Sequence, residues 1–102
     1  MIIPIGHENY IEAEAVVAIL NHDTSAARKL IKAAQAMNKL IDSTGGRRAR
    51  SIIVLKSNQV VLSSLQATAI KKRLDTFRGM LSKDKQDQQR SLLSGAHDQG
   101  LE

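Results

Sequence analysis

The chain has 102 residues, of which 42% are hydrophobic, 25% charged and 2% aromatic, and it carries a formal net charge of +5. This length excludes two independent domains, and a fold so small leaves apolar faces that other subunits tend to cover, which favours oligomerisation. Cysteine is absent, which excludes disulfides, thiol catalysis and cysteine-ligated metals. No apolar run approaches the roughly 20 residues of a membrane helix, so we expect a cytoplasmic protein.

The N-terminal part of the chain predicts two strands and one helix. Residues 2–5 are β-branched but include Pro4, which cannot donate to a sheet ladder, so we expect an edge strand with a weak role in the core. Residues 10–20 first alternate and then become continuously apolar, which predicts one strand that enters the interior; their Ala and Glu content leaves a helix as the alternative. The sequence Asp23-Thr24-Ser25 offers an N-cap for a helix over residues 24–38. Its apolar side chains recur at helical spacing at Leu30, Ala33, Ala34 and Met37.

The middle of the chain predicts a short strand, a glycine turn and a β-hairpin. Residues 40–42 are strand-like and lead into the turn Ser43-Thr44-Gly45-Gly46. Residues 51–56 and 59–63 are dense in β-branched side chains, which is typical of strands. The dipeptide Ser57-Asn58 between them predicts a two-residue hairpin turn.

The C-terminal part predicts a second amphipathic helix and a polar tail. The helix is expected to start near residues 66–68, with an apolar stripe at Ile70, Leu74, Phe77 and Leu81 and an opposite face that carries Lys71, Lys72 and Arg78. From residue 83 to 102 the polar composition predicts a disordered or marginally helical tail, and Leu101-Glu102 is interpreted as a cloning scar, so the domain spans residues 1–82. Together the elements predict an α+β fold with a small, mostly antiparallel sheet, a central β-hairpin and two amphipathic helices.

The side chains capable of catalysis show no arrangement typical of an enzyme. None of the three histidines, His7, His22 and His97, has a second ligand at metal-binding spacing, and we interpret them as ordinary surface or loop residues. Asp42 adjoins the glycine turn and is expected to cap it rather than to act in catalysis. Gly45-Gly46 lacks the further residues of a phosphate-binding or dinucleotide-binding loop. We therefore expect no enzyme activity, cofactor, metal or small-molecule substrate.

The positive charge is concentrated in one part of the chain. Residues 43–80 hold eight lysines and arginines against Asp75 alone, a net charge of +7, whereas residues 1–42 and 81–102 each carry −1. Such a concentration is typical of a protein that binds a polyanion, either nucleic acid or an anionic membrane surface. The membrane alternative would use the basic amphipathic helix over about residues 67–82.

The sequence Gly45-Gly46-Arg47-Arg48-Ala49-Arg50 places three guanidinium groups directly after the glycine turn. Glycine permits backbone conformations that turn N–H groups toward an anion, and arginine forks match phosphate oxygens or the edge of guanine. In a strand starting at Arg50, alternation would point Arg48 and Arg50 to one side and Arg47 to the other. The alternative is a solvated loop whose arginines pair with acidic residues. The chain has only two aromatic residues, which disfavours base stacking on single strands and favours backbone binding of double-stranded DNA.

A longer motif around this loop resembles a known family. Residues 40–53, which read Leu-Ile-Asp-Ser-Thr-Gly-Gly-Arg-Arg-Ala-Arg-Ser-Ile-Ile, and residues 60–66, which read Val-Val-Leu-Ser-Ser-Leu-Gln, closely resemble the RemA-like family of bacterial regulators, named for an extracellular-matrix (biofilm) regulator. The resemblance covers about residues 2–74, and Ile5-Gly6 and Asn9 match the N-terminal pattern of the family. It implies a small α+β subunit that assembles into a closed homo-oligomeric ring, binds duplex DNA through exposed arginines and regulates transcription on the nucleoid.

The resemblance also assigns DNA contacts to particular residues. Arg47 and Arg48 match the two essential DNA-contacting arginines of the family. A ring would repeat this pair in every subunit, so that weak single contacts add up to strong binding. The wider set of candidate DNA-binding residues adds a neighbouring glycine and three basic residues: Gly46, Arg50, Lys71 and Lys72.

The chain departs from the family pattern at several positions. A further DNA-contacting arginine of the family aligns with Ala15, and Ala49 replaces a threonine. The family sequence Gly-Phe-Gly-Asn becomes Gly6-His7-Glu8-Asn9, which adds an acid. We expect other basic residues to compensate in DNA binding, namely Arg50, Lys71, Lys72 or Arg28. The alternative function is a structural or protein-interaction ring with weak or no DNA binding.

Overall fold

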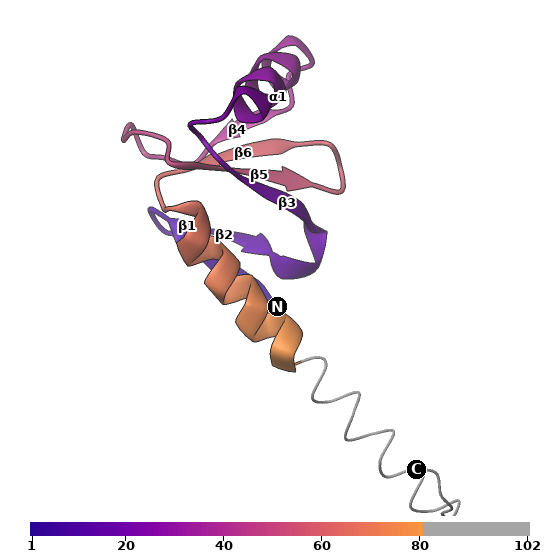
Figure 1. Ribbon diagram of the computed structural model, residues 1–102, viewed down its shortest axis with the longest axis vertical. Coiled ribbons are helices and arrows are strands. Elements are labelled where there is room, and N and C mark those ends of the chain that lie inside the picture. Colours follow the sequence, from indigo (N-terminus) through magenta and orange to yellow (C-terminus); the bar gives the residue numbers. More distant parts are fainter. Residues whose placement is uncertain (81–102) are drawn as a thin grey trace, which may run out of the picture.

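The computed structural model describes residues 1–80, which form two sheets and two helices in the predicted α+β fold (Figure 1). Helix α1 (Ser25–Ala36) covers one face of a four-stranded sheet, while a two-stranded sheet and the helix over residues 67–80 lie on the other side (Figure 1). The predicted tail over residues 83–102 and the last predicted stripe residue, Leu81, lie outside the described residues. Neither helix, as far as residue 80, has the length and apolar character needed to cross a membrane.

The four-stranded sheet contains the predicted hairpin at its centre. Its strands are β3 (Val16–Asn21), β4 (Leu40–Asp42), β5 (Ser51–Leu55) and β6 (Val60–Ser63), in the order β3-β5-β6-β4. All neighbours are antiparallel except β4 and β6, which are parallel, so the sheet is mostly antiparallel as predicted. The arrangement leaves β3 and β4 as the two edge strands.

The turn between β5 and β6 differs from the prediction by one residue. The N–H of Leu55 donates to the carbonyl of Gln59 at 2.9 Å, and the N–H of Asn58 donates to the carbonyl of Leu55 at 2.9 Å, so three residues, 56–58, form the loop. Asn58 has a φ of 68°, in the left-handed region that asparagine tolerates better than most residues. A three-residue loop that ends in a left-handed residue is a common hairpin connection.

The N-terminal strand contributes to the core, contrary to the prediction. Strands β1 (Ile2–Gly6) and β2 (Asn9–Glu12) form an antiparallel two-stranded sheet, in which Pro4 pairs with Tyr10. Ile3 and Ile5 are only 2% and 1% exposed. Because side chains alternate along a strand, both isoleucines face the core while Pro4 lies on the exposed face. In a two-stranded sheet β1 is an edge strand, as predicted, where a missing N–H is tolerated.

The segment predicted as one strand over residues 10–20 is interrupted. A 3₁₀ turn, Ala13–Ala15, separates β2 from β3 and carries the chain from the small sheet to the large one. The N–H of Ala13 donates to the carbonyl of Met1, and the carbonyl of Ala15 accepts from the N–H of Lys56, both at 2.8 Å. The single-strand prediction was wrong because these two tertiary hydrogen bonds, which the local sequence does not reveal, stabilise the turn.

The prediction of helix α1 is confirmed, but its buried face matches the predicted one only in part. The hydroxyl of Thr24 accepts the N–H of Ala27 at 3.1 Å, which makes Thr24 the N-cap. The residues that face the sheet are Ala27 and Ala34, with Ile31 partly buried. The predicted stripe is therefore rotated, since Met37 is 66% exposed and Ala33 is also exposed.

The second helix begins at residue 67, as predicted, and its apolar stripe is part of the larger core. Ile70, Leu74 and Phe77 are 0%, 3% and 9% exposed. A helix that buries this stripe in its own protein has no apolar face to insert into lipid, which argues against the membrane alternative. The stripe packs with Ala13 of the 3₁₀ turn and with residues of both sheets: Ile3, Ile5, Val16, Ile53 and Val61.

Candidate nucleic-acid interface

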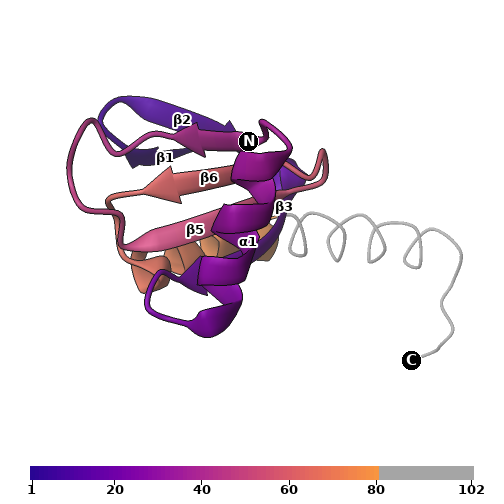
Figure 2. The ribbon, with the colours of Figure 1, turned by 90° about the horizontal axis from the view of Figure 1, so that it is seen from above.

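The candidate interface is the arginine loop, which we define as residues 45–50 between β4 and β5. It lies at one end of the four-stranded sheet, and the β5–β6 turn lies at the opposite end (Figure 2). Arg47, Arg48 and Arg50 are all exposed. Gly46, the remaining candidate in this loop, is exposed as well, and a Cβ added to it would have no heavy atom within 4 Å. The backbone here is therefore open to a close approach by another molecule.

The loop begins with a tight turn that requires its two glycines. The N–H of Arg47 donates to the carbonyl of Thr44 at 3.1 Å, and the two residues between them, Gly45 and Gly46, have φ values of 64° and 85°. Positive φ at both central positions of a turn is strained for residues with a side chain. The turn therefore fixes the direction in which the chain enters Arg47.

Asp42 caps this turn, as predicted. One carboxylate oxygen, Oδ1, accepts both the hydroxyl of Thr44 at 2.6 Å and the N–H of Thr44 at 2.9 Å. The hydroxyl bond, followed by the backbone bond, holds the pKa of Asp42 below its ordinary value of 3.8. Ser43 adds a second anchor, since its hydroxyl donates to the carbonyl of Leu62 at 2.5 Å. The start of the loop is thus tied to β6.

The end of the loop is also fixed, through the backbone of Arg50. Its N–H donates to the carbonyl of Ser63 at 2.8 Å. Its carbonyl accepts from the N–H of His22 at 3.3 Å and lies 3.0 Å from Nδ1 of the same histidine. Regular strand structure starts only at Ser51, one residue after Arg50. The alternating orientation expected for Arg47, Arg48 and Arg50 assumed a strand, and these residues precede it.

The arginines of the loop have no acidic partner in the part of the chain that the structure describes. The two ion pairs among residues 1–80 join the Met1 ammonium to Glu12 and the Lys71 ammonium to Asp75. Among the described residues, the arginines therefore do not form the alternative arrangement, in which neighbouring carboxylates would neutralise the loop. Three guanidinium groups at the end of the sheet are left to attract an anion from outside.

The turn between β1 and β2 packs against the arginine loop, which sequence reasoning did not predict. Its residues Gly6, His7 and Glu8 all have positive φ. The ring of His7 lies directly on Gly45: a Cβ at that glycine would be 2.7 Å from Nδ1 of the ring. Asn9, just after the turn, donates from its side chain to the carbonyl of Ser43 at 3.2 Å. The contact joins segments far apart in sequence, so no local pattern indicates it.

Two fully buried serines connect the surrounding elements and were also missed. The hydroxyl of Ser63 donates to the carbonyl of Ile5 at 2.7 Å and accepts the N–H of Leu65 at 3.0 Å. The hydroxyl of Ser51 donates to the carbonyl of Leu65 at 2.8 Å. Both serines are 0% exposed. In the sequence a serine at a strand end resembles a solvent-facing residue, so only the three-dimensional structure reveals these bonds.

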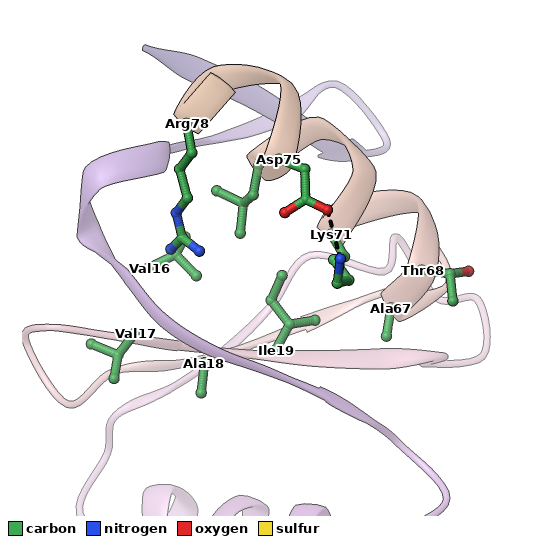
Figure 3. Close-up of a pocket in the computed structure, with 10 residues that line it drawn as sticks. Val16, Val17, Ala18, Ile19, Ala67, Thr68, Lys71, Asp75 and Arg78 are labelled. Carbon is green, nitrogen blue, oxygen red and sulfur yellow. Dashed lines mark hydrogen bonds and ion pairs between the residues drawn. The ribbon is translucent and has the colours of Figure 1, made fainter. Parts of the chain in front are cut away.

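The structure places Lys71 and Lys72 on the second helix and not in the arginine loop. Both are exposed on the second helix, and among residues 1–80 neither forms a hydrogen bond or ion pair with that loop. Lys71 instead binds Asp75 at 2.6 Å, on a groove of about 280 Å³ between the helix and β3 (Figure 3). Arg78 lies on the same groove, above Val16 (Figure 3). The predicted basic face is therefore turned partly toward the edge strand.

Ala15, where the family has a further DNA-contacting arginine, lies at the far end of the sheet. Its carbonyl accepts from Lys56 in the β5–β6 turn, whereas the arginine loop precedes the first residue of β5. Ala15 nevertheless borders the same hollow as Asn9 and Ser43, which lie at the start of the arginine loop. The predicted compensating residue Arg28 is exposed on α1.

Comparison with known proteins gives consistent results. The sequence profile of the RemA-like family, described as extracellular matrix regulatory protein A-like, matches residues 2–74. A protein of Desulfotalea psychrophila is 46% identical over 74 residues, which are 72% of this chain and 66% of that protein. Proteins of Nitratidesulfovibrio vulgaris and Oleidesulfovibrio alaskensis are 42% and 44% identical, over 71% and 68% of this chain and 82% of each relative. The names of all three provisionally assign them a regulatory role.

Proposed function

The chain belongs to the RemA-like family, and from this premise we propose that it is a transcriptional regulator that binds duplex DNA through the arginine loop. The observation that carries the proposal is the combination of three exposed arginines, two glycines at positive φ and the absence of a carboxylate partner for the loop within residues 1–80. A fixed backbone removes the cost of ordering the loop on binding, so that only the arginine side chains lose conformational entropy when they bind phosphates.

We further propose that copies of the chain assemble into a ring, which repeats the loop around one surface. Support comes from large apolar side chains that a single subunit leaves uncovered on several faces. Those more than half exposed are Ile2, Tyr10, Val17, Met37 and Met80. Repetition raises the overall affinity for DNA without any new contact, provided that one duplex reaches several loops. The family description points to control of extracellular-matrix or biofilm genes as the biological role.

The test is fluorescence anisotropy with a random duplex of about 30 base pairs across a salt series. We expect log affinity to fall linearly with log salt concentration, and Arg47→Ala/Arg48→Ala to flatten the slope by about 0.9 for each lost phosphate contact. The matched control is Lys29→Ala/Lys32→Ala, which removes the same charge from exposed positions on α1. Equal effects of both double variants would show that net charge, and not the arginine loop, governs binding.

The second candidate is an interaction ring with weak DNA binding. Two observations favour it: position 15 carries alanine, and Glu8 adds an acid to the turn that packs on the arginine loop. This candidate predicts a defined oligomer by light scattering together with a DNA affinity that the Arg47→Ala/Arg48→Ala variant does not change. A loss of affinity in that variant would reject it.

A further inference from the structure

Two histidines lie against the arginine loop, one at each end. The ring of His7 packs on Gly45, at the start of the loop, so closely that a Cβ there would meet it at 2.7 Å. The ring of His22 lies at the end of the loop, with Nδ1 3.0 Å from the carbonyl oxygen of Arg50. One comes from the β1–β2 turn and the other follows β3, so the fold brings a histidine to each end of the same loop.

The contact with Arg50 determines which nitrogen of His22 carries the proton. A carbonyl oxygen can only accept, so Nδ1 must be the donor, and the neutral ring keeps a lone pair on Nε2. A lone pair cannot donate to a phosphate oxygen, and the two repel each other. Protonation of Nε2 turns this nitrogen into a donor on a positively charged ring. A phosphate contact through Nε2 of His22 therefore requires the protonated ring.

Charged residues of both signs adjoin the two histidines. In the segments next to His7 they are Glu8, Asp42 and Arg47, in those next to His22 they are Asp23, Arg28 and Arg50, and Arg48 lies in the loop between. A DNA backbone placed at the loop would add negative charge beside both imidazoles. Nearby phosphates stabilise the protonated form of a histidine, because opposite charges attract.

We propose that His7 and His22 link DNA binding to proton uptake, each adding a phosphate contact when its ring is protonated. This inference rests on the proposed function, duplex binding at the arginine loop. Histidine as a residue type changes charge between about pH 5 and 8, so affinity for DNA rises as the pH falls through this range. By linkage, DNA binding takes up protons to the same extent. The arginines supply binding at every pH, and the histidines make its strength depend on acidity.

The experiment measures duplex affinity and salt slope by anisotropy at about pH 5.8 and pH 8.0, at matched ionic strength. We compare the parent with His7→Asn/His22→Asn. Asparagine tolerates the φ of 54° at position 7, and its amide retains a donor for the carbonyl of Arg50. The matched control is His97→Asn, which removes a histidine that the proposal does not use. Far-UV circular dichroism at both pH values verifies that each variant is folded.

We expect the parent to bind at least about tenfold more tightly at the lower pH, with a salt slope steeper by about 0.9 for each protonated histidine. The double variant should lose both differences, and the His97→Asn control should keep them. A parent affinity that is independent of pH would overturn the inference. So would a pH dependence that persists in the double variant, because other groups would then be responsible.

The two proposals fail in different ways. At about pH 8.0 most histidines are uncharged, so Arg47→Ala/Arg48→Ala tests the arginine loop alone. If that variant loses affinity at pH 8.0 while the pH series is flat, DNA binding stands and the histidine inference falls. If the parent does not bind duplex DNA at either pH, both proposals fall.

Discussion

The arginine loop and the basic face of the second helix carry similar charge, but they are built differently. In the loop, hydrogen bonds from β6 and His22 hold the backbone, and no carboxylate among residues 1–80 pairs with the arginines. On the helix, Lys71 is already 2.6 Å from Asp75. A cation with a carboxylate partner gains less from a phosphate, because the first pairing must be given up. Charge counted along the chain therefore overestimates Lys71 as a DNA contact, whereas Lys72 and Arg78 on the same face have no ion pair among residues 1–80.

The largest effect is expected from reversing the charge of the loop. Arg47→Glu/Arg48→Glu removes two phosphate contacts and adds repulsion, so we expect duplex affinity to fall about 100-fold or more at low salt. The matched control, Lys29→Glu/Lys32→Glu, makes the same charge change on α1. Fluorescence anisotropy measures the duplex affinity of both variants. Comparable losses of affinity would show that the loop contributes no more to DNA binding than other exposed basic residues.

The second prediction concerns the anchoring of the loop. Ser63→Ala leaves the carbonyl of Ile5 and the N–H of Leu65 without their partner, which should lower the free energy of unfolding by about 1–3 kcal/mol. Urea denaturation followed by circular dichroism measures the loss. Ser57→Ala is the control, because that hydroxyl binds only the exposed side chain of Gln59, and a change within about 0.5 kcal/mol is expected. Equal stability of the two variants would contradict the view that buried serines hold this end of the sheet.

The third prediction tests the helix directly. We expect Lys71→Glu/Lys72→Glu to weaken duplex binding by less than about tenfold, because these residues contribute mainly through long-range attraction. An unchanged affinity would remove the hypothesis that the two lysines compensate for Ala15. A loss as large as that of the loop variant would instead place the helix in the contact surface. Asp75→Asn, which frees Lys71 from its partner, should raise affinity by about twofold or less.

The smallest effect is expected at Asp42. Its pKa is lowered in the folded protein by hydrogen bonds from the Thr44 hydroxyl and N–H, so its charged form stabilises the fold above about pH 4. This contribution is lost as the pH falls through the lowered value. Asp42→Asn should therefore show a weaker decline of stability in acid than the parent, measured by urea denaturation from about pH 2 to 6. An identical decline in both proteins would show that the cap adds no stability to the turn.

Local patterns in the sequence were sufficient to predict most of the elements. The N-cap at Thr24, the central hairpin, the start of the second helix and the glycine turn depend on residues within a few positions of one another. Capping, strand alternation and positive φ at glycine act over this short range. The candidate site was predictable for the same reason, as far as the order Gly45-Gly46-Arg47-Arg48 describes it.

The surroundings of the site were decided by tertiary structure. The burial of Ile3 and Ile5, the break at residues 13–15 and the contacts of His7 and His22 with the arginine loop depend on segments far apart in sequence. The pairing of Lys71 with Asp75 is local, yet only the structure places it on a groove beside β3. Local sequence was enough to establish which residues carry charge and where the chain turns. Folding decided which charges have partners and which histidines lie beside the arginines, because packing and long-range hydrogen bonds act between residues that are neighbours only in space.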